Sequence, residues 1–223
     1  MKTSRYIQIA LLIFVMSTTV ILFANAKESL KKKDSFYQSM KLDNFSVVVA
    51  EENSNFLIGS NSANTVLGVS APGRPYKFNE IRISNDTLFI KEVKKSTDKL
   101  IIYGNSIKKI IGKANSNIHL NQLFNDSIFF ELSASKLSGV FKADSINTVS
   151  IMATNHSDIR LKSLVYKLPE DKKSDTRYKY PEKQHVENLK VSLKNHSKIS
   201  MRMKKPKRLI VELDSTSNYE TSK

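Results

Sequence analysis

The fold is decided by a short block that recurs along the chain. Its clearest copies are Asn115-Ser116-Asn117-Ile118-His119-Leu120, Asn155-His156-Ser157-Asp158-Ile159-Arg160-Leu161 and Asn195-His196-Ser197-Lys198-Ile199-Ser200-Met201, with a looser copy at Ser133-Ala134-Ser135-Lys136-Leu137-Ser138-Gly139-Val140. The first apolar residue after each turn is Ile118, Leu137, Ile159 and Ile199, in steps of 19, 22 and 40 residues. We interpret the step of 40 as two steps of about 20 residues, with one copy obscured.

Within each block the apolar and polar residues alternate, which is the period of a β-strand with one face in a core. The same alternation occurs at Ile81-Arg82-Ile83, from Leu189 to Leu193 and from Leu209 to Leu213. Groups of Asn, Asp, Ser and Gly separate these stretches, and such residues favour turns. No stretch after residue 40 has the pattern of an amphipathic helix of ten or more residues. The sequence therefore predicts an all-β protein.

The repeat predicts a β-solenoid over residues 41–213, in which each coil of about 20 residues is paired with the coils above and below it. An antiparallel sandwich is the alternative, because its strands also recur roughly every 8 to 12 residues. The recurring Asn-x-Ser-x-Ile-x-Leu pattern favours the solenoid. We expect Asn44 to Val69 to cap the first coil, and residues 214–223 to form a polar tail.

One stretch interrupts the solenoid pattern. Pro169 to Gln184 contains two prolines and nine charged residues, which predicts a loop inserted into the stack of coils. Such insertions are where repeat proteins often carry binding surface. The contact candidates are Lys172, Lys173, Arg177, Tyr178, Lys179 and Tyr180. The alternative is a solvated loop that has no partner.

The N-terminus carries an export segment. Lys2 and Arg5 precede an uncharged run over residues 6–26, and the small-x-small ending predicts signal-peptidase cleavage between Ala26 and Lys27. The same run is long enough to remain as a single membrane anchor. Residues 27–40 then form a basic linker. With either outcome we expect the rest of the chain in the periplasm or cell envelope, cleaved or anchored in the inner membrane.

The charge balance is strongly basic. The chain has 36 Lys and Arg residues, 21 Asp and Glu residues and no cysteine, and without the first 26 residues 34 basic groups still face 21 acidic ones. Such a field favours anionic polysaccharide, lipid headgroups or an acidic envelope protein. Nucleic acid is disfavoured, because arginine is scarce beside lysine and no aromatic ladder accompanies the basic clusters. The densest cluster supplies the candidates Lys204, Lys205, Lys207 and Arg208. A solvated, lysine-rich surface without a ligand is the alternative.

The search for catalytic chemistry finds little. His156 and His196 occupy the same position of the repeated turn, so a solenoid would bring them together, and with Asp158 they could bind a metal ion. A pair of turn histidines facing water is the preferred interpretation. Asp126, Asp144 and Asp158 fall at turns rather than along one strand face. We therefore expect no cofactor, no metal site and no enzymatic activity.

The stretch from Leu88 to Leu213 resembles a bacterial domain family of the Bacteroidetes, labelled putative auto-transporter adhesin, head GIN domain. The resemblance is carried by Asn85-Asp86-Thr87-Leu88-Phe89-Ile90, by Lys99-Leu100-Ile101-Ile102-Tyr103 and by the successive turn-and-strand copies. It implies a right-handed parallel β-helix and a cell-surface or periplasmic role, without an established ligand. The family often has glycine at the turn, whereas here only Gly139 is kept.

These observations predict an exported, non-enzymatic module for binding, adhesion or structural support that presents a basic solenoid surface to anionic glycan, lipid or protein. The first alternative is a polysaccharide-processing enzyme on a β-helix scaffold, which needs a cluster of acids or bases in one groove. The second is a membrane-anchored periplasmic accessory or signalling partner, for which retention of residues 6–26 would be diagnostic.

Overall fold

The computed structural model describes residues 16–21, 23, 25, 37–70, 76–91, 99–104, 106–123, 126–141, 146–163, 186–203 and 205–222. Residues 16–21, 23 and 25 are helical, and no helix in the described part of the chain is long and apolar enough to cross a bilayer. Most of the export segment, the cleavage site at Ala26 and Lys27, and linker residues 27–36 lie outside the described residues. The prediction that the linker extends over residues 37–40 is wrong, because these residues belong to a strand.

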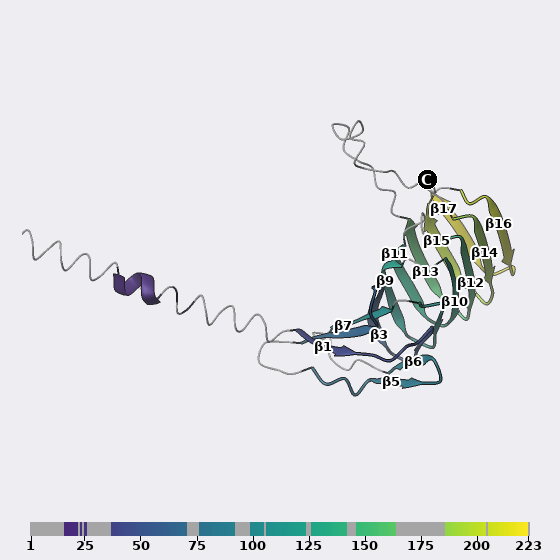
Figure 1. Ribbon diagram of the computed structural model, residues 1–223. Helices are drawn as coiled ribbons and strands as arrows, with labels where there is room; N and C mark the ends of the chain where they lie inside the picture. The colour runs from purple at the N-terminus through teal and green to yellow at the C-terminus, as the bar shows by residue number, and fades with distance from the viewer. Residues whose placement is uncertain are drawn as a thin grey trace, which may run out of the picture.

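The described strands form two mixed sheets (Figure 1). Sheet A has the spatial order β1 (Tyr37–Lys41), β4 (Thr65–Val69), β7 (Lys99–Gly104), β3 (Asn55–Ser60), β9 (Asn117–Leu123), β11 (Lys136–Phe141), β13 (Asp158–Ser163), β15 (Lys198–Arg202), β17 (Asn218–Ser222). Sheet B has the order β16 (Arg208–Leu213), β14 (Asn188–Leu193), β12 (Thr148–Thr154), β10 (Ser127–Ser133), β8 (Lys109–Gly112), β2 (Val47–Ala50), β6 (Thr87–Ile90), β5 (Ile81–Ser84). The predicted all-β class is confirmed.

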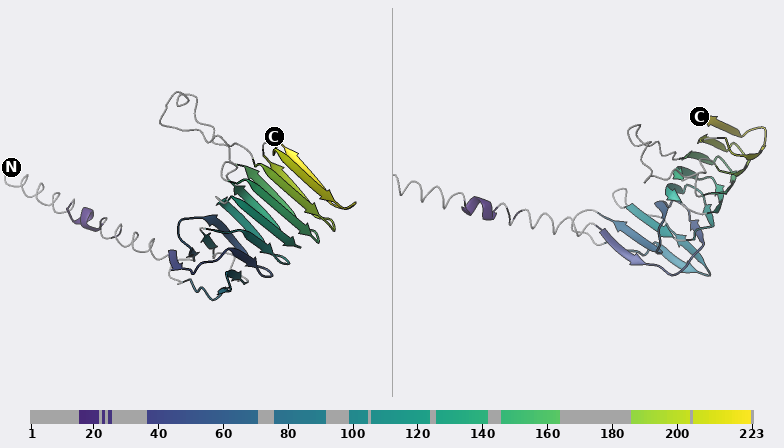
Figure 2. Two further views of the ribbon diagram at one scale, coloured as in Figure 1. Left: turned by 45° about the vertical axis from the view of Figure 1, so that its right-hand side comes forward. Right: turned by 45° about the horizontal axis from the view of Figure 1, so that its top comes forward.

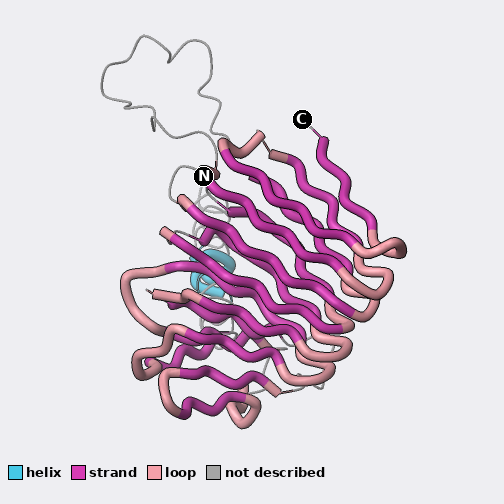
Figure 3. Tube along the Cα trace, turned by 90° about the vertical axis from the view of Figure 1, so that its right-hand side faces the viewer, coloured by secondary structure: helices cyan, strands magenta, loops and turns pink. Residues whose placement is uncertain are grey.

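From β8 to β17 the chain alternates between the two sheets, and each strand pairs in parallel with the strand two places later (Figures 2 and 3). We call one strand of sheet B and the following strand of sheet A a coil. The alignment predicted from the repeat is confirmed, since Leu137 pairs with Ile118 on one side and with Ile159 on the other, and Ile159 pairs with Ile199. The antiparallel sandwich is therefore excluded for this part of the chain.

The step of 40 residues is one coil rather than two, so the prediction of an obscured copy is wrong. Ile159 is the direct register partner of Ile199, and Val149 is the direct partner of Leu189. No strand lies between these pairs in either sheet, because β13 neighbours β15 and β12 neighbours β14. Pairing requires strands in register and tolerates connections of different length, since closing a longer loop costs little additional entropy. The six contact candidates of the predicted loop lie outside the described residues.

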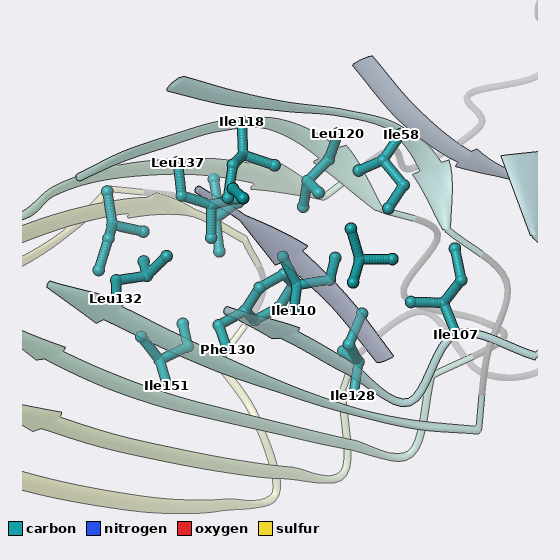
Figure 4. Close-up of a cluster of buried hydrophobic side chains, with 14 of the residues drawn as sticks. Ile58, Ile107, Ile110, Ile118, Leu120, Ile128, Phe130, Leu132, Leu137 and Ile151 are labelled. Carbon is teal, nitrogen blue, oxygen red and sulfur yellow. The ribbon is translucent and has the colours of Figure 1, made fainter. Parts of the chain in front are cut away.

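The core lies between the two sheets. Figure 4 shows Ile118 and Leu137 of sheet A pointing toward Ile110, Phe130 and Ile151 of sheet B. All five side chains are almost completely buried. Because the strands are in register, each coil covers the apolar side chains of the coil beside it.

The turn chemistry explains why Asn and Ser recur in the block. Asn115, Asn155 and Asn195 have positive φ angles of 59°, 57° and 55°, a conformation that asparagine tolerates better than most residues. The serines that follow these turns are buried, and those after the Asn155 and Asn195 turns donate to turn carbonyls, whereas the Ser116 hydroxyl has no hydrogen-bond partner among the described residues. Ser157 Oγ donates to the Thr154 carbonyl at 2.7 Å, and Ser197 Oγ donates to the Lys194 carbonyl at 2.7 Å.

Gly139 lies inside a strand rather than at a turn. It belongs to β11, where it pairs with Leu120 and Leu161, and its φ angle is +131°. A Cβ atom at this position would lie 2.2 Å from the carbonyl oxygen of Leu120. The glycine is therefore required by the close approach of β9 and β11 and not by turn formation.

The first end of the stack departs from the repeat. β2 and β3 lie within the stack, between β6 and β7 on one side and β8 and β9 on the other. The edges are formed by β1 in sheet A and β5 in sheet B, and β1, β4 and β5 pair antiparallel with their neighbours. The prediction that residues 44–69 cap the stack is therefore wrong for β2 and β3, and correct only in that β4 lies toward the edge.

The opposite end of the stack is a coil of β16 and β17. β17 pairs in parallel with β15, so the prediction that residues 214–223 form a polar tail is wrong for residues 218–222. This strand was hidden in the sequence because its inward side chains, Tyr219 and Thr221, include only one large apolar group. Leu209 and Leu213 of β16 are exposed, although they occupy core positions of the repeat.

Candidate binding face

The outward side of sheet A carries a group of cations over β11, β13 and β15. Side chains alternate across a strand, so the residues between the buried Ile159 and Leu161 and on either side of them point away from the core. The register places these outward residues in columns of Lys136, Asp158 and Lys198, of Ser138, Arg160 and Ser200, and of Val140, Lys162 and Arg202. We call Lys136, Arg160, Lys162, Lys198 and Arg202 the cation face.

Asp158 is the acidic centre of this face. Its carboxylate accepts hydrogen bonds from Arg160 through Nε at 3.4 Å and Nη2 at 3.0 Å, and Lys198 Nζ lies 3.6 Å from Oδ2. Two cations therefore share one acid, which leaves an excess of positive charge.

Lys162 and Arg202 are register partners at the end of β13 and β15. Both side chains are exposed, and within the described residues neither forms an ion pair. Like charges directly opposite each other on neighbouring strands destabilise a sheet. This pair is therefore a site where an anion would relieve repulsion that the folded chain leaves in place.

A shallow groove with a volume of about 420 Å³ continues the face toward β17. It is lined by Asp158, Arg160, Lys198, Ile199, Ser200, Asn218 and Glu220. Asn218 Nδ2 donates to Glu220 Oε1 at 3.0 Å, so the groove ends in an acidic and amide pair. The groove can thus offer cations at one end and hydrogen-bonding groups at the other.

The predicted Lys204–Arg208 cluster lies at the corner that leads from β15 to β16. Lys205 and Arg208 are exposed, while Lys207 pairs with Glu187 at 3.4 Å. Lys204 lies outside the described residues. Arg208 begins β16 and therefore belongs to sheet B rather than to the cation face of sheet A.

His156 and His196 stack as the repeat predicted. Their ring centroids are 4.9 Å apart, with an interplanar angle of 16°, and both residues are exposed. In the part of the chain that the structure describes, no group of three His, Cys, Asp or Glu residues could hold a metal ion. The two rings agree with the interpretation of turn histidines that face water.

Of the three acids considered for an enzyme, the two that the structure describes, Asp126 and Asp158, lie on different sheets. Asp126 lies at the corner before β10 of sheet B and accepts a hydrogen bond from the Asn147 side chain, whereas Asp158 lies on sheet A. Asp144 lies outside the described residues.

None of the five cation-face residues is a candidate predicted from the sequence, although Lys136, Arg160 and Lys198 belong to the repeat copies. Runs of charge do not reveal these cations, because apolar residues separate them along the chain. The signal was nevertheless present, because aligning the repeat on Ile118, Leu137, Ile159 and Ile199 brings Lys162 beside Arg202. In a repeat, charged residues at the same aligned position become neighbours, so clusters of charge form between coils as well as along the chain.

No family model matches the sequence, and no curated protein matches it. Among solved structures, a "putative adhesin" from Bacteroides fragilis is similar at 12% identity, covering 83% of this chain and 96% of that chain with a TM-score of 0.42. One from Parabacteroides merdae has 10% identity, coverage of 84% and 95%, and a TM-score of 0.35. A "putative lipid binding protein" from Parabacteroides distasonis has 7% identity, coverage of 82% and 95%, and a TM-score of 0.35.

Proposed function

We propose that the protein is an exported, non-enzymatic binding module of the cell envelope that holds an anionic polysaccharide on the cation face of sheet A. The scaffold would be a right-handed parallel β-helix, since crossovers between parallel strands of one sheet are almost always right-handed. The same proposal includes membership of the adhesin-like family that the sequence resembles, and delivery across the inner membrane by residues 1–26.

The observation that carries the proposal is the exposed, unpaired couple of Lys162 and Arg202. On sheet B, by contrast, Lys109 Nζ lies 2.7 Å from Glu131 Oε2 and 5.2 Å from the centre of the Phe129 ring. The sheet B cation is thus neutralised within the fold, whereas the sheet A pair is left for a ligand. A like-charged pair costs stability and brings no benefit within the fold itself.

The spacing of the cations suits a polymer. Neighbouring strands lie about 4.8 Å apart, and alternate residues of one strand lie about 6.6 Å apart, so the cation face is a rigid lattice of charges. One exposed charge pair contributes little to binding, roughly 0 to 1 kcal/mol. A polyanion that contacts several cations at once gains from their combined effect, because the later contacts form within one complex.

The polarity of the face favours a glycan over a lipid bilayer. The outward residues of β13 and β15 are all polar or charged, and Val140 of β11 is the one apolar residue in the three columns. Peripheral binding to a bilayer usually adds apolar side chains that enter the boundary of the acyl chains. Hydroxyl and amide groups such as those of Ser200 and Asn218 suit the hydroxyls of a sugar chain.

The test compares two variants with the same change of charge. Lys162→Glu/Arg202→Glu reverses the proposed site, and Lys113→Glu/Lys190→Glu reverses two exposed lysines elsewhere. The full chain, purified from the envelope fraction in mild detergent, is measured for binding to immobilised alginate, with uncharged dextran as the neutral probe. We expect the wild type and the control to bind alginate in a salt-sensitive manner, and the site variant to bind at least about tenfold more weakly.

Equal losses in the two variants would mean that only net charge matters, and would overturn the site. Equal binding to dextran and alginate, or binding that does not change between low and high salt, would overturn the proposal of an anionic ligand. A preference for anionic lipid vesicles over alginate would replace the glycan by a membrane surface.

A further inference from the structure

We propose that a second copy of this chain docks on the free edge of β16, by antiparallel self-pairing of the two β16 strands about a two-fold axis at Ile210. The proposal rests on the β16–β17 coil and does not depend on the ligand of the cation face. It would join two stacks end to end at their uncovered coils.

The first observation is apolar surface that the repeat normally covers. Leu209 and Leu213 are 38% and 46% exposed, whereas their register partners Leu189 and Leu193 are 1% and 0% exposed. The residues are chemically the same and hold the same position in the coil. The difference is that β14 is covered by β16, and no described strand covers β16. Removing this surface from water favours a partner.

The second observation is the direction of the backbone groups of β16. The N–H of Arg208 donates to the Glu187 carbonyl at 2.8 Å, and the N–H of Asp214 donates to the Leu193 carbonyl at 3.2 Å. Because these groups alternate along a strand, the even-numbered residues of β16 face β14. Leu209, Val211 and Leu213 therefore direct their N–H and C=O groups to the free edge, where another strand can pair with them.

The third observation is that β16 is complementary to itself in charge. A two-fold axis at Ile210 sets Arg208 opposite Glu212 of the second copy, and Glu212 opposite Arg208 of the second copy. It also makes Leu209 and Val211 of the second copy a hydrogen-bonded pair, which uses the backbone groups of the free edge. The charged residues and Ile210 then form non-hydrogen-bonded pairs, in which opposing side chains are closest.

A shifted register is less favourable. An axis at Val211 would set Arg208 opposite Asp214 of the second copy, but Asp214 already accepts hydrogen bonds from the Asn195 N–H at 2.5 Å and from the Thr216 hydroxyl at 2.9 Å. The same shift would place Glu212 against the apolar Ile210. An unrelated partner strand would require no symmetry of charge about Ile210, so the symmetry favours a second copy.

Joining two copies at this edge would also extend the cation face. β17 is the edge strand of sheet A, and β16 is the edge strand of sheet B at the same end of the stack. β15, which carries part of the cation face, is the neighbour of β17. Two copies of the lattice would then lie on one elongated body. A polyanion spanning both would gain further affinity from contacts within the same complex.

The chain contains no cysteine, so one introduced thiol reports the contact directly. Ile210→Cys should give a disulfide-linked dimer of the full chain in the oxidising envelope, seen on a non-reducing gel and lost on reduction. Residues in a non-hydrogen-bonded antiparallel pair have Cα atoms about 4.5 Å apart, within the range of a disulfide. Ser192→Cys, on the same outer face but on β14, is the control and should remain monomeric.

A charge-swap cycle tests the register in the Ile210→Cys background. Arg208→Glu alone and Glu212→Arg alone each place like charges opposite one another and should lower the yield of the cross-linked dimer about tenfold. The double variant Arg208→Glu/Glu212→Arg restores opposite charges and should restore the yield. Circular dichroism of each variant checks that it is folded.

Three outcomes would overturn the proposal. Ile210→Cys could stay monomeric, or link to a protein of different mass, so that the occupant is not a second copy. Ser192→Cys could cross-link as well as Ile210→Cys, which would indicate unspecific collision. The double charge swap could be no better than the single variants, so that Arg208 and Glu212 do not meet. Because alginate binding is measured on other residues, this test can fail while the proposed function stands.

Discussion

The two ends of the stack differ in how far the apolar side chains of the last coil are covered. At the first end, β1, β4 and β5 run antiparallel to their neighbours and cover the last parallel strands, so that Val66 and Ile102 are fully buried. At the other end, β16 and β17 keep the parallel repeat to the edge, and the core positions Leu209 and Leu213 remain exposed. A parallel repeat cannot close itself, because every coil leaves the same apolar face and backbone edge for the next.

The closed end also depends on a close contact that the repeat does not use. Tyr76 packs directly on β4, and a Cβ atom on Gly68 would lie 2.3 Å from Tyr76 Cγ. The Tyr76 ring also lies 5.1 Å from that of Phe78. Closure therefore requires residues outside the block, and the β16–β17 coil has no counterpart of them in the described chain.

The largest expected effect is at the closed end. Ile102→Ala removes a side chain that packs between Val66 and Ile58, its register partners, and should lower the free energy of unfolding by about 2 to 5 kcal/mol. Chemical denaturation measures the change. The neighbour Ile101, which points outward, is the control, and Ile101→Ala should cost less than half as much. Equal costs would mean that the antiparallel strands do not close the core.

A matched pair of leucines compares a covered coil with the last coil of the repeat. Leu189→Ala should cost about 2 to 5 kcal/mol, because this side chain is buried by the following coil. Leu209→Ala, one coil later, should cost about 1 kcal/mol when measured at low protein concentration. A rise in the cost of Leu209→Ala with protein concentration would indicate that the exposed coil becomes covered by a second molecule. Equal costs at every concentration would contradict an open end.

A smaller change in stability is expected at the buried serines that follow the turns. Ser157→Ala removes the hydrogen bond to the Thr154 carbonyl and should cost about 1 kcal/mol in thermal or chemical unfolding. Ser54 holds the same position near the closed end, and its buried hydroxyl has no hydrogen-bond partner. Ser54→Ala should therefore be neutral or slightly stabilising. The reverse order would show that the serine hydroxyls do not stabilise the turns.

The smallest effect concerns acid stability of the open coil. The Asn195 N–H, together with Thr216, holds the pKa of the Asp214 carboxyl well below its usual range. The ionised form is thus favoured in the folded state, so its contribution to stability is present above about pH 4 and is lost as the pH falls. Stability measured between pH 5 and pH 2 should decline less steeply in Asp214→Asn than in the wild type. Identical slopes would contradict this role.

Much of the repeat could be predicted because its causes are local. Alternation assigns a strand, and the preference of Asn for positive φ and of Ser for turn carbonyls marks each corner. The alignment of Ile118, Leu137, Ile159 and Ile199 therefore corresponds to the observed register. The cation face was harder to predict from the sequence. Lys162 and Arg202 are far apart in the chain and become neighbours only when β13 pairs with β15.

The sequence by itself thus determined the all-β class, the inward and outward faces of each strand, and which residues stand above one another in the repeat. Only the tertiary structure decided that β2 and β3 lie between strands that follow them in the chain, that the 40-residue step is a single coil, and that antiparallel strands cover one end whereas no described strand covers β16. The physical reason is range. Residue alternation and turn chemistry act over a few residues, whereas strand order and edge coverage depend on contacts between segments far apart in the chain.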